Sequence, residues 1–209
     1  MPHPHLDAQL RGIDGPDAVL IPLRSLRTGK QRLGATFTAE QRASMITFMA
    51  DRVVRAAHEL PVLIVHDDPA VANWAAERGA ASLQPTTPGL NEAVTAGRDL
   101  LADRGVERVI VAHADLPEAN DLRLMLSDDA VSIAPDRHRV GTNVLCVATA
   151  LPFTFAYGPG SFERHCEVAR SLGVDARIVE APDLSRDINH PDDLDGLDAL
   201  TRLLQQEQS

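Results

Sequence analysis

The segment RVIVAHADLP, residues 108–117, sets the architecture of this chain. Residues 109–112 are apolar without interruption, whereas a strand with one face in water alternates apolar and polar side chains. Uninterrupted apolar strands are typical of parallel sheets that helices cover on both faces. We therefore predict a central strand at residues 108–112. Asp115 follows just beyond its carboxyl end, where sheets of this kind bind their ligands.

On either side of this segment, apolar runs alternate with amphipathic stretches. Such alternation is typical of βαβ units and indicates an α/β fold with a mostly parallel sheet flanked by helices. Thr38, with Gln41 three residues later, has the spacing of a helix-capping box. The pattern predicts further strands at residues 18–23, 61–66, 80–84, 130–134, 142–147 and 176–180, and helices at residues 38–58, 69–78, 91–103, 118–126, 161–172 and 191–204.

The length and composition indicate one globular domain. We place this domain at residues 18–204 of the 209, after a flexible segment at residues 1–17 and before a frayed tail at residues 205–209. A formal net charge of −10 repels nucleic-acid phosphates, and aromatic residues, at 3%, are too few for a base-stacking surface. No apolar run has the length of a secretory signal or a bilayer span. We expect a cytoplasmic protein that binds neither nucleic acid nor membrane.

The loop after the first predicted strand, PLRSLRTGKQRL at residues 22–33, carries four cations. Arg24, Arg27, Lys30 and Arg32 surround a glycine and two hydroxyl side chains, a composition that suits a triphosphate. The spacing is not that of a Walker A loop. Lys30 is the only lysine of the chain, which indicates a position where a compact point charge is needed. The alternative is that Lys30 merely escaped a general bias toward arginine.

Two aspartates follow predicted strands in the same way. Asp115 lies after the central strand, and Asp187, in SRDINHPDDL, lies after the last strand and before a proline-initiated helix. Mg²⁺ is characteristically held by one or two carboxylates together with phosphate oxygens, so the pair predicts a divalent-metal site. The alternative for Asp115 is that it only caps the following helix.

Residues 157–162, YGPGSF, place a glycine-rich turn at the start of a predicted helix. The backbone N–H groups of Gly158, Gly160 and Ser161 form a candidate anion site there, and Thr142 would add a hydroxyl. A plain turn with a serine cap explains the same letters equally well.

Three polar side chains give weaker signals. Asn91, in the PGLN turn at residues 88–91, has both the donor and the acceptor that are needed to read a purine edge. His113 and His138 flank the predicted cleft, although histidines in such places are often simply solvated or hydrogen-bonded.

Together, and in this order, these segments resemble one family. The set PLRSLRTGKQRL, PGLNEAV, VAHADLP, SIAPDR with RVGTNVL, YGPGSFERH and RDINHPDDL is similar to the CofC/FbiD family, the phospholactate or phosphoenolpyruvate guanylyltransferases of coenzyme F(420) biosynthesis. The resemblance covers residues 18–200 and is most specific in the GTN and YGPGSF segments. It implies a Rossmann-related, glycosyltransferase-A-like nucleotidyltransferase fold, with a mixed but mostly parallel sheet.

The resemblance also implies the substrates and the roles of the residues. GTP and a small phosphorylated acid would be the substrates, and Mg²⁺, or Mn²⁺ in its place, would be the cofactor. The implied roles are Lys30, Arg32 and Asp115 for catalysis; Asp115 and Asp187 for the metal; Thr142, Gly158 and Ser161 for the phosphorylated acid; and Leu23, Arg24, Lys30, Gly89 and Asn91 for the nucleotide.

The chain departs from the family pattern beside two of these segments. Gln31 follows the lysine where the family often has serine or threonine, and residues 138–140 (His, Arg, Val) stand where it often has a further glycine. The acceptor therefore stays open among phosphoenolpyruvate, 2-phospho-L-lactate and 3-phospho-D-glycerate. Contact with the next enzyme of the pathway and the oligomeric state also stay open.

Two other functions compete with this prediction. One is a different nucleotidyltransferase of the same fold, acting on a molybdenum cofactor or a sugar phosphate, because ADLP and the final aspartate motif also occur in those enzymes. The other is a non-catalytic protein that binds a nucleotide on the same scaffold.

Overall fold

A single seven-stranded sheet organises the protein, whose computed structural model describes residues 12–206. The strand order across the sheet is β3-β2-β1-β4-β6-β5-β7, which puts β4 in the middle, as its apolar sequence predicts. The strands are β1 (Asp17–Pro22), β2 (Val62–Val65), β3 (Ala81–Leu83), β4 (Arg108–Ala112), β5 (Val131–Pro135), β6 (Thr142–Ala148) and β7 (Arg177–Ile178).

The sheet is mixed but mostly parallel, and this expectation is confirmed. β1, β2, β3 and β4 are parallel neighbours, and β5 pairs in parallel with β7. β6 is antiparallel to both β4 and β5, so it is the one reversed strand of this sheet. The carboxyl ends of the other strands consequently lie at one edge.

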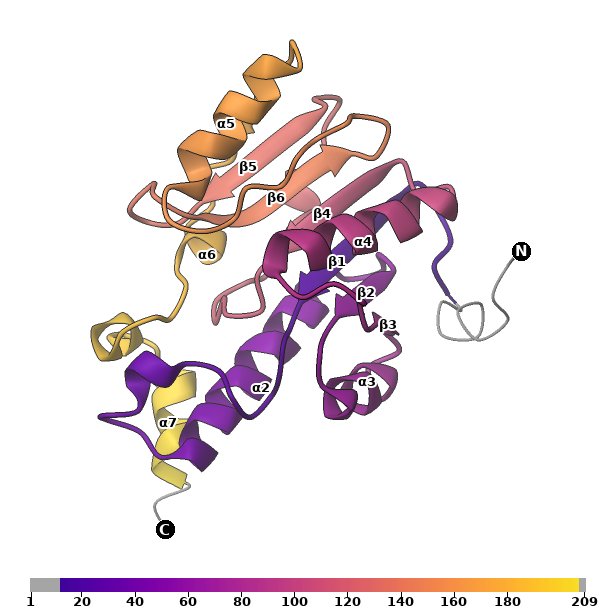
Figure 1. Ribbon diagram of the computed structural model, residues 1–209. Helices are drawn as coiled ribbons and strands as arrows, with labels where there is room; N and C mark the ends of the chain where they lie inside the picture. Colours follow the sequence, from indigo (N-terminus) through magenta and orange to yellow (C-terminus); the bar gives the residue numbers. More distant parts are fainter. Residues whose placement is uncertain (1–11, 207–209) are drawn as a thin grey trace.

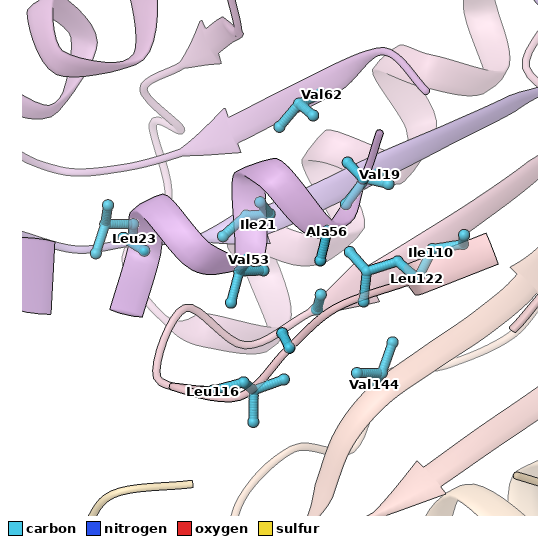
Figure 2. Packing of buried hydrophobic residues seen from close by; sticks show 14 of the residues in the cluster. Val19, Ile21, Leu23, Val53, Ala56, Val62, Ile110, Leu116, Leu122 and Val144 are labelled. Atoms are coloured by element: carbon cyan, nitrogen blue, oxygen red, sulfur yellow. The ribbon is translucent and has the colours of Figure 1, made fainter. Parts of the chain in front are cut away.

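Helices cover both faces of the sheet (Figure 1). One face packs against α2 (Ala39–Ala56), α3 (Pro69–Ala76) and the short α6 (Pro182–Ser185). The other packs against α4 (Leu90–Asp103) and α5 (Ser161–Ser171). Because side chains alternate along a strand, β1 sends Val19 and Ile21 into the first core and Leu20 into the second. Figure 2 shows part of the first core, with Val53 and Ala56 of α2 packed over the side chains of β1 and β4.

A third, smaller core joins the end of the chain to α2. α7 (Asp198–Gln206) lies beside α2 in Figure 1, and Leu200 and Leu204 of α7 pack with Met45 and Met49 of α2. Ile188 belongs to the same core, so the packing of α7 also holds the segment that carries Asp187.

Two predicted helices are wrong. In residues 118–126, Asp121 adopts an extended conformation and its side chain accepts the Arg123 N–H at 2.9 Å, so only the 3-10 helix η2 (Leu122–Met125) forms. Residues 191–204 are interrupted at Gly196, whose φ of 80° is left-handed. The segment therefore divides into the 3-10 helix η3 (Pro191–Leu194) and α7. The prediction also missed α6 and the 3-10 helix η1 (Gln31–Leu33).

The predicted flexible segment and frayed tail fall partly outside the described residues, which exclude 1–11 and 207–209. Within the described part, Ile13 is only 6% exposed and packs in the second core, and α7 continues to Gln206. None of the helices in residues 12–206 has the length and hydropathy needed to cross a bilayer.

The predicted capping box of α2 is present and is testable. The Thr38 hydroxyl accepts the Gln41 N–H at 3.2 Å, and the Gln41 side chain accepts the Thr38 N–H at 3.0 Å. Thr38→Ala removes this cap, so we expect urea denaturation to show a free energy of unfolding lower by about 1 kcal/mol. The control is Thr47→Ala in the middle of the same helix, which should change it by less than about 0.5 kcal/mol. Equal losses in the two variants would contradict a specific role for the cap.

Candidate active site

Three segments that are distant in sequence emerge together at the carboxyl edge of the sheet. In the parallel pairs, Leu20 of β1 lies opposite Val111 of β4, and Pro22 lies opposite Val65 of β2. The loop at residues 23–30, the pair at residues 66–67 and the segment at residues 113–115 therefore leave the sheet side by side. This is the edge at which α/β sheets bind ligands.

Lys30 and Asp115 form the central ion pair of this edge. Lys30 Nζ lies 2.5 Å from Asp115 Oδ2 and also donates a hydrogen bond to the Ile188 carbonyl. The two side chains are 11% and 24% exposed, so the pair is largely withdrawn from water. Three segments of the chain thus meet at one ammonium group.

Lys30 makes this contact from a strained backbone. Lys30 has a φ of 56°, in the left-handed region, which costs a residue with a Cβ about 1–2 kcal/mol. The preceding Gly29 lies against α2, where an added Cβ would come within 2.7 Å of Ile46 Cδ1. Strain of this kind persists where the surrounding structure enforces it, commonly at functional sites.

Asp187 lies next to Asp115, as predicted, but it does not follow a strand end: α6 separates it from β7. The Ile188 N–H donates to the Asp115 carbonyl at 3.3 Å, and the Asp187 carboxylate accepts a hydrogen bond from the Asn189 side chain. Burial raises the pKa of Asp187, and the neighbouring Asp115 carboxylate raises it further. Burial also acts to raise the pKa of Asp115, but the Lys30 ammonium, its hydrogen bond and smaller contributions together hold that pKa below its usual value.

The second carboxylate oxygen of Asp115 has no partner among the described residues. Asp115 Oδ1 is buried and makes no hydrogen bond there, although an unpaired buried polar atom is costly and calls for an explanation. In residues 12–206 no group of three His, Cys, Asp or Glu side chains is arranged to hold a metal ion. Asp115 and Asp187 thus fit a cation such as Mg²⁺, which takes few protein ligands and completes its shell with phosphate and water.

A cavity of about 580 Å³ adjoins this charged cluster. Its volume falls in the usual range of small-molecule sites, about 300–1,000 Å³. It extends from Lys30 and Asp115 past the end of β2 to the turn at residues 85–90. One end of the cavity is therefore charged, and the other is lined by apolar side chains and hydroxyls.

The structure brings four of the five predicted nucleotide residues to this cavity. Leu23, Arg24, Lys30 and Gly89 line it. Asn91 does not line it: its Oδ1 accepts the Tyr157 N–H at 2.7 Å, and its Nδ2 donates to the Tyr157 carbonyl at 3.3 Å. The predicted catalytic Arg32 is exposed on η1 and is also not part of the cavity wall.

The prediction missed several polar residues of the cavity wall. His66 and Asp67 follow β2 just as Asp115 follows β4, and this strand-end position was the signal that would have found them. Thr86 and Thr87 come from the turn before α4 and carry no such signal. Ser25 lies in the predicted phosphate loop but was not singled out.

The two histidines that were expected to flank the cleft differ. His113 lines the cavity, and burial lowers its pKa, so it is neutral at pH 7. Its ring lies 5.1 Å from the Tyr157 ring, centroid to centroid. His138 is exposed on the loop after β5, accepts a hydrogen bond from Arg137, and does not border the cavity, so that expectation is wrong for His138.

The residues that were predicted for the phosphorylated acid lie together, but they are not on the cavity wall. The Thr142 N–H donates to Ser161 Oγ at 3.0 Å, and these two residues are only 2% and 3% exposed. The Ser161 N–H closes the turn by donating to the Gly158 carbonyl at 3.0 Å. The expectation that this N–H is free for an anion is therefore wrong for this conformation, in which the turn is closed.

The loop before Thr142 explains how the chain departs from the family pattern. The Asp136 carboxylate accepts the N–H groups of His138, Val140 and Gly141 at 2.8–3.0 Å, which folds the loop tightly. Arg139 then takes a left-handed φ of 55°, a conformation that glycine adopts more easily. The loop thus needs the kind of backbone that a glycine would supply, although no glycine stands at residues 138–140.

Sequence comparison relates this chain to known proteins. A family model described as "Guanylyl transferase CofC like" matches residues 17–199. The phosphoenolpyruvate guanylyltransferase of Sphaerobacter thermophilus is 35% identical over 187 residues, which cover 85% of this chain and 90% of that protein. The protein of the same name from Rubrobacter xylanophilus is 36% identical over 189 residues, covering 86% and 92%.

Solved structures share the fold at much lower identity. A nucleotidyl transferase from Methanothermobacter thermautotroptrophicus superposes with a TM-score of 0.64 at 13% identity, covering 92% of this chain and 100% of that one. The 4-diphosphocytidyl-2C-methyl-D-erythritol synthase of Anaerococcus prevotii gives 0.57 at 12% identity, covering 92% and 98%. The nucleotidyltransferase fold that the sequence predicts is therefore confirmed.

The Lys30–Asp115 pair can be tested by a double-mutant cycle in metal-free buffer at pH 7. Lys30→Met leaves a carboxylate without its cation and should lower the free energy of unfolding by about 2 kcal/mol, less than the roughly 3–5 kcal/mol of a fully buried pair because the pair borders the cavity. Adding Asp115→Asn should restore at least half of this loss. Purely additive effects of the two substitutions would show that the pair contributes no coupling.

The stability of the Lys30→Met variant should depend on pH in a defined direction. In the wild type the folded pKa of Asp115 is lowered, so its contribution to stability is complete above the unfolded pKa of about 3.9 and is lost as the pH falls through the folded value. In Lys30→Met, burial without the ammonium raises that pKa, and the ionised carboxyl destabilises the protein near neutrality. The difference in the free energy of unfolding between the wild type and Lys30→Met should therefore become smaller from pH 7 to pH 4. A difference that does not change with pH would show that the ionised Asp115 carboxyl is not its cause.

Proposed function

The chain belongs to the CofC-like guanylyl transferase family, and on that premise we propose that it transfers the guanylyl group of GTP to the phosphate of a three-carbon acid, with release of pyrophosphate. Phosphoenolpyruvate is the first candidate acceptor, because the two relatives described above are named for it. We place the reaction in coenzyme F(420) biosynthesis, with 2-phospho-L-lactate and 3-phospho-D-glycerate as the other acceptors to be tested.

One observation carries this proposal. Lys30, Asp115 and Asp187 converge at the carboxyl edge of the sheet, beside a cavity whose volume is usual for a small-molecule site. Two carboxylates and one ammonium leave a net negative charge, which favours a divalent cation and would repel a bare triphosphate. This arrangement supports chemistry on a metal-bound nucleotide.

Asp115 and Asp187 are the residues that would hold Mg²⁺. The unpaired, buried Asp115 Oδ1 supports this assignment, because a cation would satisfy it. When bound, Mg²⁺ would neutralise charge on the phosphates of the nucleotide. Mn²⁺ has the same preference for oxygen ligands and is an alternative.

The proposed step is an in-line displacement at the α-phosphorus of GTP. A phosphate oxygen of the acceptor forms the new P–O bond, the bond between the α-phosphorus and the bridging oxygen breaks, and pyrophosphate leaves with its electron pair. A phosphate monoester has a second pKa of about 6, so it is mostly dianionic at pH 7 and needs no general base. The protein's contribution is then positioning and charge neutralisation.

Lys30 is suited to the nucleotide side of this step. An ammonium group has three N–H donors, and two of them are used by Asp115 and the Ile188 carbonyl. The third remains for a phosphate oxygen of the nucleotide at the charged end of the cavity. Arg24, which lines the cavity and pairs with Asp67 at 2.9 Å, lies at its exposed mouth.

The acceptor site is proposed at Thr142, Gly158 and Ser161. Because the Thr142 N–H and Ser161 Oγ bond each other, an acceptor phosphate has to replace that hydrogen bond when it binds. The turn between Gly158 and Ser161 opens in this proposal, and Gly158, with a φ of 125°, supplies the backbone freedom to do so.

The activity is tested by measuring pyrophosphate release over a panel of nucleotides and acceptors. We expect release from GTP with phosphoenolpyruvate in the presence of Mg²⁺, and none when EDTA removes the metal. Release that requires CTP, or a sugar phosphate as acceptor, would overturn this assignment in favour of another nucleotidyltransferase activity.

Asp115→Asn should lower kcat by about 10²–10³-fold, because it removes an electrostatic group at the reacting phosphates. The matched control is Asp192→Asn, an exposed aspartate of η3 that should leave kcat unchanged. Circular dichroism of both variants would establish that they fold. Near-normal turnover by Asp115→Asn would remove this residue from the proposed metal site.

A further inference from the structure

Tyr157 lies at the junction of the two proposed substrate sites. It is the only tyrosine of the chain, is 7% exposed, and directly precedes the Gly158 turn. Its ring centroid lies 5.1 Å from that of His113 and 4.8 Å from that of His165. One side of the ring therefore contacts the strand end that carries Asp115, and another contacts α5, which begins at Ser161.

Asn91 fixes the backbone of Tyr157 from the nucleotide side. It accepts the Tyr157 N–H at 2.7 Å and donates to the Tyr157 carbonyl at 3.3 Å, so a single side-chain amide holds both backbone polar groups of Tyr157. Asn91 is the second residue of α4 and follows Gly89 and Leu90, which line the nucleotide cavity. The turn on the nucleotide side and the turn on the acceptor side are thus joined by two hydrogen bonds.

His165 continues the connection to Thr142. The Ala156 N–H donates to His165 Nε2 at 3.0 Å, so that nitrogen carries a lone pair. Burial, helped by Arg164 and His113, lowers the pKa of His165 to about 4, so the ring is neutral at pH 7. Its hydrogen is consequently on Nδ1, which donates to Thr142 Oγ1 at 3.0 Å. His165 thus connects the Thr142 hydroxyl to Ala156, which directly precedes the Tyr157 backbone that Asn91 holds.

We propose that Asn91 and Tyr157 are positioning residues for the acceptor and that Asn91 is not a reader of the guanine base. The clamp on Tyr157 sets where Gly158, Thr142 and Ser161 lie relative to Asp115. This inference rests on the proposed function, because it assigns the acceptor to those three residues. An in-line attack is sensitive to such placement, since an error of about 1 Å can cost about 10²-fold in rate.

The ring and the backbone of Tyr157, and not its hydroxyl, are the parts that position the acceptor in this proposal. The phenol oxygen is buried and has no hydrogen-bond partner among the described residues. Removing an unpaired buried hydroxyl forfeits no bond within the protein. Tyr157→Phe keeps the ring contacts and the backbone clamp, whereas Tyr157→Leu loses the contacts with His113 and His165.

Steady-state kinetics on the full chain, with GTP and phosphoenolpyruvate each varied in turn, test the proposal. We expect Asn91→Ala to raise the acceptor KM about tenfold or more and to lower kcat, while the GTP KM changes by less than about threefold. Asn91→Asp keeps the acceptor of the Tyr157 N–H and should recover part of the loss. Asn73→Ala, at an exposed asparagine of α3, is the control for the substitution itself.

Substitutions of Tyr157 test the proposal in a second way. Tyr157→Phe should keep the acceptor KM within about threefold of the wild type and leave the urea midpoint unchanged or higher. Tyr157→Leu should raise the acceptor KM as Asn91→Ala does. An equal rise in Tyr157→Phe would mean that the hydroxyl contacts the acceptor itself, which contradicts a positioning role.

The outcomes separate this inference from the proposed function. If the wild type turns over and Asn91→Ala raises the GTP KM as much as the acceptor KM, Asn91 belongs to the nucleotide site and the inference is wrong. If the wild type releases no pyrophosphate with any acceptor, the proposed function fails, and the inference fails with it.

Discussion

The structure of this site depends on one carboxylate, Asp115, which lies largely out of water at the end of the central strand. Such a group is stable only when a cation faces it, and Lys30 meets this need from a strained, left-handed backbone. Lys30 also holds the Ile188 carbonyl, which fixes the segment of Asp187. A single ammonium group thus joins the loop after β1, the end of β4 and the segment after α6.

The cluster of Lys30, Asp115 and Asp187 has less positive than negative charge. With Asp187 beside the pair, two acids face one lysine, and the structure sets their pKa values in opposite directions: Asp115 is lowered by the ammonium, and Asp187 is raised by burial and by its neighbour. A divalent cation and a phosphate ligand would complete the balance. The charge arrangement and the adjoining cavity therefore support the same chemistry for independent reasons.

The two halves of the site differ in how open they are. The proposed nucleotide side is a cavity of about 580 Å³ bordered by residues of five separate segments. On the proposed acceptor side, Thr142 and Ser161 bond each other, and both are buried. The buried connection through Asn91, Tyr157 and His165 ties the two sides together, so the geometry of one is not independent of the other.

Local patterns in the chain were enough to predict the central strand and the capping box at Thr38, because these follow from hydrophobic periodicity and from bonds within one helical turn. The approach of Asp187 to Asp115 was also predicted, but its cause was not: α6 separates Asp187 from β7, and contacts of Ile188 with Asp115 and Lys30 bring this segment into place. The break at Gly196, the role of Asn91 and the place of His66 in the cavity were not predictable in this way. Each depends on contacts between segments that are far apart along the chain. A side chain such as Asn91 can serve a ligand or the backbone of another loop equally well, and only the packing of α4 against the segment of Tyr157 decides between them.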